Sequence, residues 1–271
     1  MQVSFWSNYH QVGTTNNMIA VAVYLAFRCR MRILVAHNHF DRSTLETAFI
    51  DKSYLEHSLM DFSDTGIDAL SRFIRFNRIE KDEIACYTTT VIRNRLDLLA
   101  GTRITNMDIY QNGLKETIHL ILKSAADYYD LVLIDTAPGI NEVSRSIIEN
   151  SDLIAVNLSQ NPYTIDNFLS NYGNYMDKAF LIIGKYDGNS RYNIKKIKKR
   201  FRLDHIHAIP YSTEFADACI ESRAVDFIIK NLKADKNDIH SSFIKGVAET
   251  AESMLRLLGL EDKYAAGGQG E

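Results

Sequence analysis

SNYHQVGTTNN (residues 7–17) separates two apolar runs near the start of the chain, residues 3–6 and residues 18–23. A β-branched and aromatic run, a polar turn with one glycine, and then an apolar helix-length run are the setting of a phosphate-binding loop. In such a loop a strand passes directly into a helix, whose first N–H groups bind an anion. This stretch therefore predicts an α/β fold with an anion site beside residues 10–16.

Short apolar runs recur along the chain, separated by stretches with helical spacing of apolar residues. We expect strands at residues 2–6, 32–36, 96–100, 131–134, 153–158, 180–183 and 206–209. Strands that alternate with helices predict a mostly parallel sheet flanked by helices on both faces. In that architecture ligands lie beyond the carboxyl ends of the strands, where residues 7–17 fall.

Composition narrows the class of protein. The 271 residues are 46% hydrophobic and 24% charged, and the net charge of −3 argues against a globally basic nucleic-acid binder. Three widely separated cysteines form no CxxC pair, which argues against a disulfide framework or a zinc knuckle. The purely apolar residues 18–27 are about half of a membrane span. We expect one domain at residues 1–262, a disordered tail at 263–271, no transmembrane segment and a cytoplasmic location.

The loop matches half of the Walker A pattern G-x-x-x-x-G-K-[ST]. Gly13 stands at the second glycine and Thr15 at the hydroxyl position, whereas Asn8 and Thr14 replace the first glycine and the lysine. Main-chain N–H groups attract phosphate without any side-chain charge. The predicted phosphate-binding residues are His10, Gln11, Val12, Gly13, Thr14, Thr15 and Asn16.

A second motif, YDLVLIDTAPG (residues 129–139), has the form of a Walker B strand. Its aspartate, Asp135, ends an apolar strand and precedes a Pro-Gly turn. A carboxylate in this place holds Mg²⁺ opposite the loop hydroxyl. The sequence therefore predicts a Mg²⁺ site at Thr15 and Asp135.

With these motifs in place, the chain from Val3 to about Leu260 resembles the ParA/MinD family of deviant-Walker ATPases, P-loop NTPases of the SIMIBI group. The family loop S-G-K-G-G-V-G-K-T-T lies over residues 7–16 without a gap, and DTAPG resembles its DTPPG segment. IPY at 209–211, followed by Ala218 and by residues 222–225, resembles a late family segment. SDLIAVNLSQN and IPYSTEFADAC are most similar to the TadZ/CpaE branch, which is associated with Flp/Tad pilus assembly.

The resemblance implies a nucleotide-binding switch or positioning protein that serves the assembly or localisation of a surface machine. It implies ATP and Mg²⁺ as cofactors and a homodimer as the assembly state. It also implies protein partners in a cytoplasmic or membrane-associated assembly, with recruitment to the inner face of the membrane.

The chain departs from the family pattern at its charged positions. Tyr9 and Thr14 replace the two family lysines, and His37-Asn38-His39 replaces the family D-x-D. Losing one charged hydrogen bond weakens binding by roughly 10- to 100-fold, whereas hydrolysis depends on cations and a positioned water. We therefore expect a pseudo-ATPase that binds nucleotide, with weak or no hydrolysis and with Asp135 as the one candidate catalytic residue. The alternative is an active ATPase with non-standard catalytic groups.

Three histidines, His10, His37 and His39, are expected near one pocket. When they are protonated below about pH 6.5, they replace part of the lost positive charge. Nucleotide affinity is then expected to increase as the pH falls from about 7.5 to 6. As neutral ligands they hold a zinc-type metal with Asp135 or Asp41. A third interpretation is that they are polar residues at the mouth of a decayed site.

Two further segments carry candidate contacts. Gly184-Lys185-Tyr186-Asp187 weakly resembles the guanine-reading N-K-x-D, although adenine is the base favoured by analogy alone. Lys185, Pro210 and Tyr211 are expected in one pocket with His37, His39 and Asp41. The alternative for this segment is a plain turn at a strand end.

Residues 191–202 contain seven cations, expected on the outer face of a helix. They predict either a solvated face or a patch for an anionic partner, including DNA if the chain is a partition protein. The cations are Arg191, Lys195, Lys196, Lys198, Lys199, Arg200 and Arg202.

Overall fold

The computed structural model of the chain describes residues 1–40, 43–51, 53, 64–203, 205–233 and 238–262. Its core is an eight-stranded sheet with the strand order β3-β4-β2-β5-β1-β6-β7-β8. All neighbouring strands are parallel except β3, which runs antiparallel to β4. The strands are β1 (Gln2–Trp6), β2 (Ile33–His37), β3 (Thr89–Ile92), β4 (Leu96–Leu99), β5 (Leu131–Asp135), β6 (Leu153–Leu158), β7 (Ala179–Tyr186) and β8 (Ile206–Pro210).

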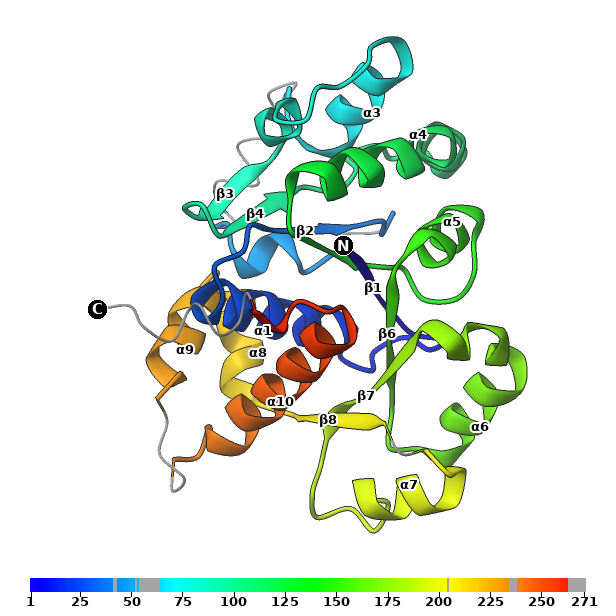
Figure 1. Cartoon of the computed structure of the whole chain (residues 1–271), viewed down its shortest axis with the longest axis vertical. Helices are drawn as coiled ribbons and strands as arrows, with labels where there is room; N and C mark the ends of the chain where they lie inside the picture. The colour runs from blue at the N-terminus through cyan, green and yellow to red at the C-terminus, as the bar shows by residue number, and fades with distance from the viewer. Residues whose placement is uncertain (41–42, 52, 54–63, 204, 234–237, 263–271) are drawn as a thin grey trace.

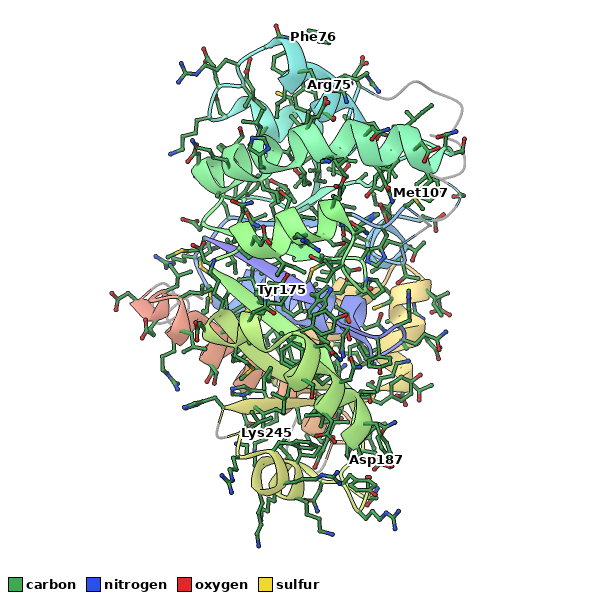
Figure 2. The ribbon with its side chains drawn as sticks, turned by 90° about the vertical axis from the view of Figure 1, so that its right-hand side faces the viewer. Arg75, Phe76, Met107, Tyr175, Asp187 and Lys245 are labelled. Carbon is green, nitrogen blue, oxygen red and sulfur yellow. The ribbon has the colours of Figure 1, made fainter. Side chains whose placement is uncertain are left out.

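Helices cover both faces of the sheet (Figure 1). One layer contains α1 (Thr14–Arg28), α8 (Thr213–Ile220), α9 (Ala224–Asn231) and α10 (Ser241–Leu257). The opposite layer contains α3 (Gly66–Phe76), α4 (Met107–Tyr128), α5 (Glu142–Asn150), α6 (Pro162–Asn171) and α7 (Ile194–Phe201). Figure 2 looks onto this opposite layer, from Phe76 at one end towards Asp187 near the other. Short 3₁₀ turns are η1 (Glu46–Ala48), η2 (Glu83–Tyr87) and η3 (Gly173–Lys178).

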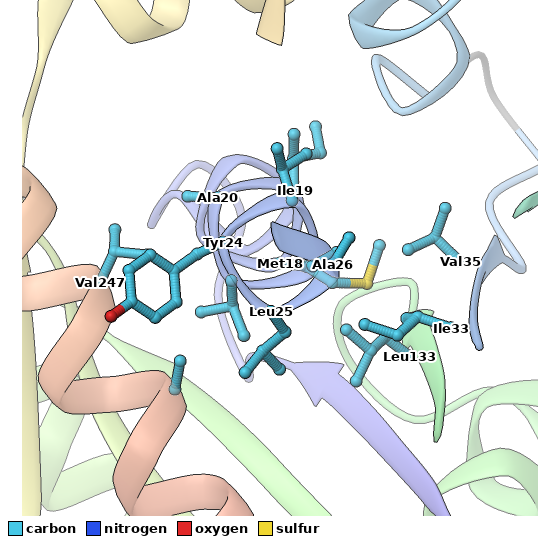
Figure 3. Packing of buried hydrophobic residues seen from close by; sticks show 14 of the residues in the cluster. Met18, Ile19, Ala20, Tyr24, Leu25, Ala26, Ile33, Val35, Leu133 and Val247 are labelled. Carbon is cyan, nitrogen blue, oxygen red and sulfur yellow. The ribbon is translucent and has the colours of Figure 1, made fainter. Parts of the chain in front are cut away.

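Helix α1 forms the centre of its layer because it is apolar on every side. Every residue from Asn17 to Ala26 is buried, and Met18, Leu25 and Ala26 lie near strand residues while Tyr24 faces Val247 of α10 (Figure 3). A helix that is hydrophobic all round is stable only when it is covered on all sides. Burial of α1 between the sheet and α10 therefore fixes the position of the loop that precedes it.

The predicted α/β fold is confirmed, with all seven expected strands present in a mostly parallel sheet. Strand β3 was not predicted, because this edge strand is partly exposed and its residues show no alternation of buried and exposed side chains. The described strands form one continuous sheet, the single domain at residues 1–262 stays a prediction, and the expected tail at 263–271 lies outside the described residues. Among the described helices, none has the length and apolar character needed to cross a bilayer.

Candidate functional site

The loop between β1 and α1 presents unpaired main-chain N–H groups. Gln11 (φ 61°) and Gly13 (φ 93°) adopt left-handed backbone conformations, and α1 begins directly afterwards at Thr14. Among the described residues, the N–H groups from Gln11 to Asn16 have no hydrogen-bond acceptor. The first turn of α1 carries no acidic side chain, so the positive end of the helix dipole is uncompensated. This arrangement attracts an anion.

Two neighbouring strands, β7 and β6, contact the loop and the first turn of α1. A Cβ atom on Gly184 of β7 would lie 2.1 Å from the carbonyl oxygen of Val12, so the β7 backbone supports the loop directly. On the next strand, Asn157 accepts a 2.8 Å hydrogen bond from the side-chain amide of Asn17, and both residues are buried. The loop conformation is therefore set by β6 and β7 as well as by its own sequence.

Asp135 lies at the carboxyl end of β5, opposite the start of α1. Its Oδ2 accepts a 2.7 Å hydrogen bond from the Thr15 hydroxyl and lies 3.2 Å from His39 Nε2. The carboxylate is fully buried, and its second oxygen, Oδ1, has no hydrogen-bond partner among the described residues. The predicted pairing of Thr15 with Asp135 is present in the structure.

This pair has the chemistry of a Mg²⁺ site. Mg²⁺ prefers oxygen ligands, and proteins commonly supply one or two of them beside phosphate and water. Thr15 Oγ1 and Asp135 provide such oxygens, and the unpaired buried Oδ1 leaves an acceptor for a cation or its bound water. The residues present therefore fit Mg²⁺.

Asn38 connects β2 to the segment after β5. Its side chain accepts a 2.7 Å hydrogen bond from the Ala137 N–H and donates a 3.0 Å hydrogen bond to Ser144 Oγ. Its backbone carbonyl accepts a hydrogen bond from the hydroxyl of Tyr110 in α4. Sequence reasoning missed this role, although a polar residue directly after a buried strand is a usual signal for such a link.

His37 does not line the cleft, so the expectation that three histidines share one pocket does not hold for it. It is 4% exposed; its Nε2 lies 2.6 Å from Glu46 Oε1, and its Nδ1 accepts the His39 N–H. Burial alone raises the pKa of Glu46, but the charge and hydrogen bond of His37 and the Gly101 N–H outweigh it and lower this pKa to about 2. Glu46 and Gly101 belong to distant segments, so no sequence signal indicated this pairing.

His10 and His39 remain at the mouth of a cleft of about 600 Å³ that surrounds the loop and Asp135. Among the described residues lining it, Asp135 is the one acid and Lys185 is the one lysine or arginine. The lining residues are Ser7, Tyr9, His10, Gln11, Gly13, Thr14, Thr15, Asn16, Asn38, His39, Phe40, Thr44, Met107, Tyr110, Gln111, Asp135, Thr136, Ala137, Pro138, Asn141 and Lys185. Val12 is buried beneath the loop and does not line the cleft.

Pro210 and Tyr211 lie in a separate, much smaller cavity of about 20 Å³. Gly13, Asn16 and Lys185 line both cavities, so the two spaces meet at the loop. Lys185 therefore lies with Pro210 and Tyr211 beside the main cleft, whereas His39 and Lys185 alone of the expected pocket line the main cleft, as far as the described residues show.

The zinc alternative is not supported by the described residues, in which no three His, Cys, Asp or Glu side chains are placed to hold a metal ion. Asp41, the other acid named for that site, lies outside the described residues.

The basic segment forms α7, as its spacing predicts, with Ile197 buried and Asn193 capping the helix. It borders a groove of about 380 Å³ lined by Pro162, Arg191, Tyr192, Lys196, Ile197, Arg200 and Phe201. Arg191 lies over the Tyr192 ring, and Arg200 lies 3.7 Å from Asp166. None of the basic residues of this segment lines the cleft around the loop, as far as the described residues show.

Comparison with known proteins identifies the fold. No protein-family model matches the chain, and no curated protein matches it significantly. Three solved structures align over nearly their whole length. The chain is 15% identical to a ParA family ATPase from Chlorobium tepidum TLS, with a TM-score of 0.71 over 92% of this chain and 98% of that one.

The septum site-determining protein MinD of Pyrococcus horikoshii OT3, complexed with Mg-ADP, gives a TM-score of 0.70 at 14% identity, over 96% of this chain and 98% of that one. A putative plasmid partition protein of Borrelia burgdorferi B31 bound to AMPPNP gives 0.67 at 16% identity, over 94% and 98%. At these identities the similarity establishes the fold alone. The chain therefore has the ParA/MinD-type P-loop NTPase fold, with a mostly parallel sheet between two layers of helices.

Proposed function

We propose that the protein is a nucleotide-binding switch or positioning protein whose cleft takes a nucleoside triphosphate with Mg²⁺. The observation that carries this proposal is the run of unpaired N–H groups from Gln11 to Asn16, in a loop that lines the same cleft as the Thr15–Asp135 pair. The N–H groups would bind phosphate, and the two side-chain oxygens would hold Mg²⁺, which screens phosphate charge when bound. The Mg-ADP and AMPPNP bound by the two neighbours support this ligand class.

We propose weak or no hydrolysis for the same site. Phosphoryl transfer requires cations around the transferred group and a residue that positions the attacking water. Among the described residues lining the cleft, Asp135 is the one carboxylate, and it is already engaged with Thr15 and His39. This arrangement favours a pseudo-ATPase over an active ATPase with non-standard groups.

The biological role follows from the family resemblance and belongs to this proposal. The protein would act as a homodimer that contacts proteins of a cytoplasmic or membrane-associated assembly, such as a Flp/Tad pilus machine at the inner face of the membrane. Adenine is the base favoured by analogy. An increase in nucleotide affinity as the pH falls from about 7.5 to 6 stays a prediction for His10 and His39, the two of the three histidines that line the cleft.

Calorimetric titration with MgATP, combined with a steady-state phosphate-release assay, tests the site. We expect micromolar binding by the natural protein, and roughly 10- to 100-fold weaker Mg²⁺-dependent binding by Thr15→Ala, because that variant loses an oxygen ligand. Asp135→Asn should behave alike, and phosphate release should stay near background in all three proteins. Ser146→Ala, at a half-buried position of α5 that does not line the cleft, is the control and should bind as the natural protein does.

Two results would contradict the proposal. If the protein does not bind MgATP at millimolar concentration, the proposed nucleotide site is wrong. Rapid phosphate release that disappears in Thr15→Ala and Asp135→Asn would instead show an active ATPase.

One observation favours a second function beside the first. The α7 groove combines three cations with two aromatic side chains, so it suits an anionic partner such as a nucleic acid or an acidic protein. A DNA-binding partition protein would use this surface.

A further inference from the structure

The loop itself supplies no permanently charged cation, since residues 7–17 contain His10 but no lysine or arginine. Main-chain N–H groups attract an anion, but they do not neutralise the several charges of a di- or triphosphate. Lys185 is the one lysine or arginine among the described residues that line the cleft, and it comes from the end of β7. The backbone conformation, the packing and the charge of Lys185 decide whether it can supply the cation that the loop lacks.

The backbone at Lys185 departs from the regular strand. Its φ of 50° is left-handed, which is uncommon for a residue with a Cβ atom. The pairing of β7 with β8 shifts register between Ile183 and Tyr186, around this residue. Non-glycine residues in this conformation are held by their surroundings and occur often at functional sites. The irregularity directs Lys185 to the loop.

The aliphatic part of Lys185 packs on the loop. Its Cγ lies 3.3 Å from the position that a Cβ atom on Gly13 would take, and its backbone nitrogen lies 3.7 Å from the same point. Gly13 therefore leaves room for the lysine stem as well as allowing the left-handed turn. The ammonium lies three bonds beyond Cγ, so its range includes the space in front of the loop N–H groups.

The ammonium group of Lys185 has no charged partner in the part of the chain that the structure describes. The side chain is exposed, and it makes no ion pair or hydrogen bond with any described residue. Lys178, seven residues earlier, shows the structural alternative, since its ammonium donates to the Glu149 and Ser151 carbonyls at 3.1 Å. Lys185 therefore keeps three N–H donors for a ligand.

From these observations we infer that Lys185 is the phosphate-neutralising cation of this cleft and acts in place of a loop lysine. The inference rests on the proposed function and narrows it. The ligand is an anion with two or more linked phosphates, held by the N–H groups of the loop from one element and by an ammonium from another. Contact with phosphate, and not with the base or ribose, is the specific content of this inference.

Calorimetry with four proteins tests it: the natural chain, Lys185→Gln, Lys185→Arg and Lys123→Gln. Lys123 is exposed on α4 and lies outside the cleft lining, so its variant is matched in charge. We expect Lys185→Gln to bind MgATP and inorganic tripolyphosphate roughly 10- to 100-fold more weakly, because a charged hydrogen bond is lost. Lys185→Arg should retain most of the affinity, and Lys123→Gln should bind normally.

The outcomes separate the inference from the proposal beneath it. If the natural protein binds MgATP and Lys185→Gln binds it equally well, the inference is wrong and the proposed function stands. If Lys185→Gln weakens competition by adenosine as strongly as it weakens binding of MgATP, the lysine contacts the nucleoside and the inference is wrong. If the natural protein binds neither MgATP nor tripolyphosphate at millimolar concentration, the proposed function fails and the inference fails with it.

Discussion

His207 on β8 illustrates how one half-buried side chain gives the protein a pH dependence. Its ring stacks on Phe180 with ring centroids 4.7 Å apart. Burial, assisted by the positive charge of Lys198, lowers the pKa of His207 from 6.5 to about 4. Between these two values the unfolded chain binds a proton that the folded chain does not bind. The free energy of unfolding therefore falls as the pH drops from about 6.5 to 4, and this contribution is fully present above 6.5.

Replacing this histidine should reduce the loss of stability in weak acid. We expect the urea midpoint of the natural protein to fall between pH 7 and pH 5 by more than the midpoint of His207→Gln, which has no group to protonate there. His119→Gln, on the exposed surface of α4, should keep the natural pH dependence. Glu46 does not interfere, because its lowered pKa affects stability between about 4.5 and 2. Equal falls in the natural protein and His207→Gln would contradict the assignment.

The contact between β7 and the loop links two elements that the sequence places far apart. Gly184→Ala would place a Cβ atom 2.1 Å from the Val12 carbonyl oxygen, which belongs to the backbone and cannot rotate away. We expect the loop to shift, with a loss of roughly 1–3 kcal/mol in the free energy of unfolding. Binding of MgATP should weaken at least about tenfold, because misplaced N–H groups lose hydrogen bonds to phosphate.

Urea unfolding and calorimetry of this variant measure both effects. Gly173→Ala in η3 is the control, since an added Cβ atom there meets no atom within 4 Å. Gly173→Ala should therefore leave binding unchanged. A Gly184→Ala protein that folds and binds like the natural one would show that the loop tolerates the contact.

Local patterns predicted most of the sheet and the two halves of the site. The run at Leu153–Leu158, apolar except for Asn157, was predicted with its observed bounds, because a strand buried on both faces is indicated by its hydrophobicity alone. The Thr15–Asp135 pair followed from two loops at the same edge of a parallel sheet. In each case the signal lay within a few residues of the feature.

The remaining features depend on contacts between distant segments. His37 and His39 appear equivalent in the sequence, yet β2 ends at His37, whose partner Glu46 is supplied by η1. Gly101 fits closely against the same ring, since a Cβ atom there would lie 2.1 Å from His37 Cε1. No local sequence pattern indicates that Glu46 and Gly101 surround His37, and so none predicts that His37 lies outside the cleft. The orientation of Lys185, set by the register shift in β7, was hidden for the same reason.

Charge is distributed unevenly over the protein, and this asymmetry predicts how it meets charged surfaces. The chain carries −3 in total while residues 191–202 carry +7, so the other 259 residues carry −10. Separated charge of this kind orients a protein towards an oppositely charged surface even when the net charge is unfavourable. The exposed cations of α7 should therefore face an anionic partner first.

Retention on a cation exchanger at low salt and pH 7.5 tests this orientation. We expect the natural protein to bind the resin despite its net negative charge, and Lys195→Glu/Lys199→Glu to pass through, because the patch loses four charge units. Lys123→Glu/Lys245→Glu changes the net charge equally but lies on α4 and α10, so it should still be retained. Equal elution of the two double variants would mean that net charge alone governs binding. Salt-dependent binding of duplex DNA by the natural protein, lost in Lys195→Glu/Lys199→Glu alone, would further identify the anionic partner as nucleic acid.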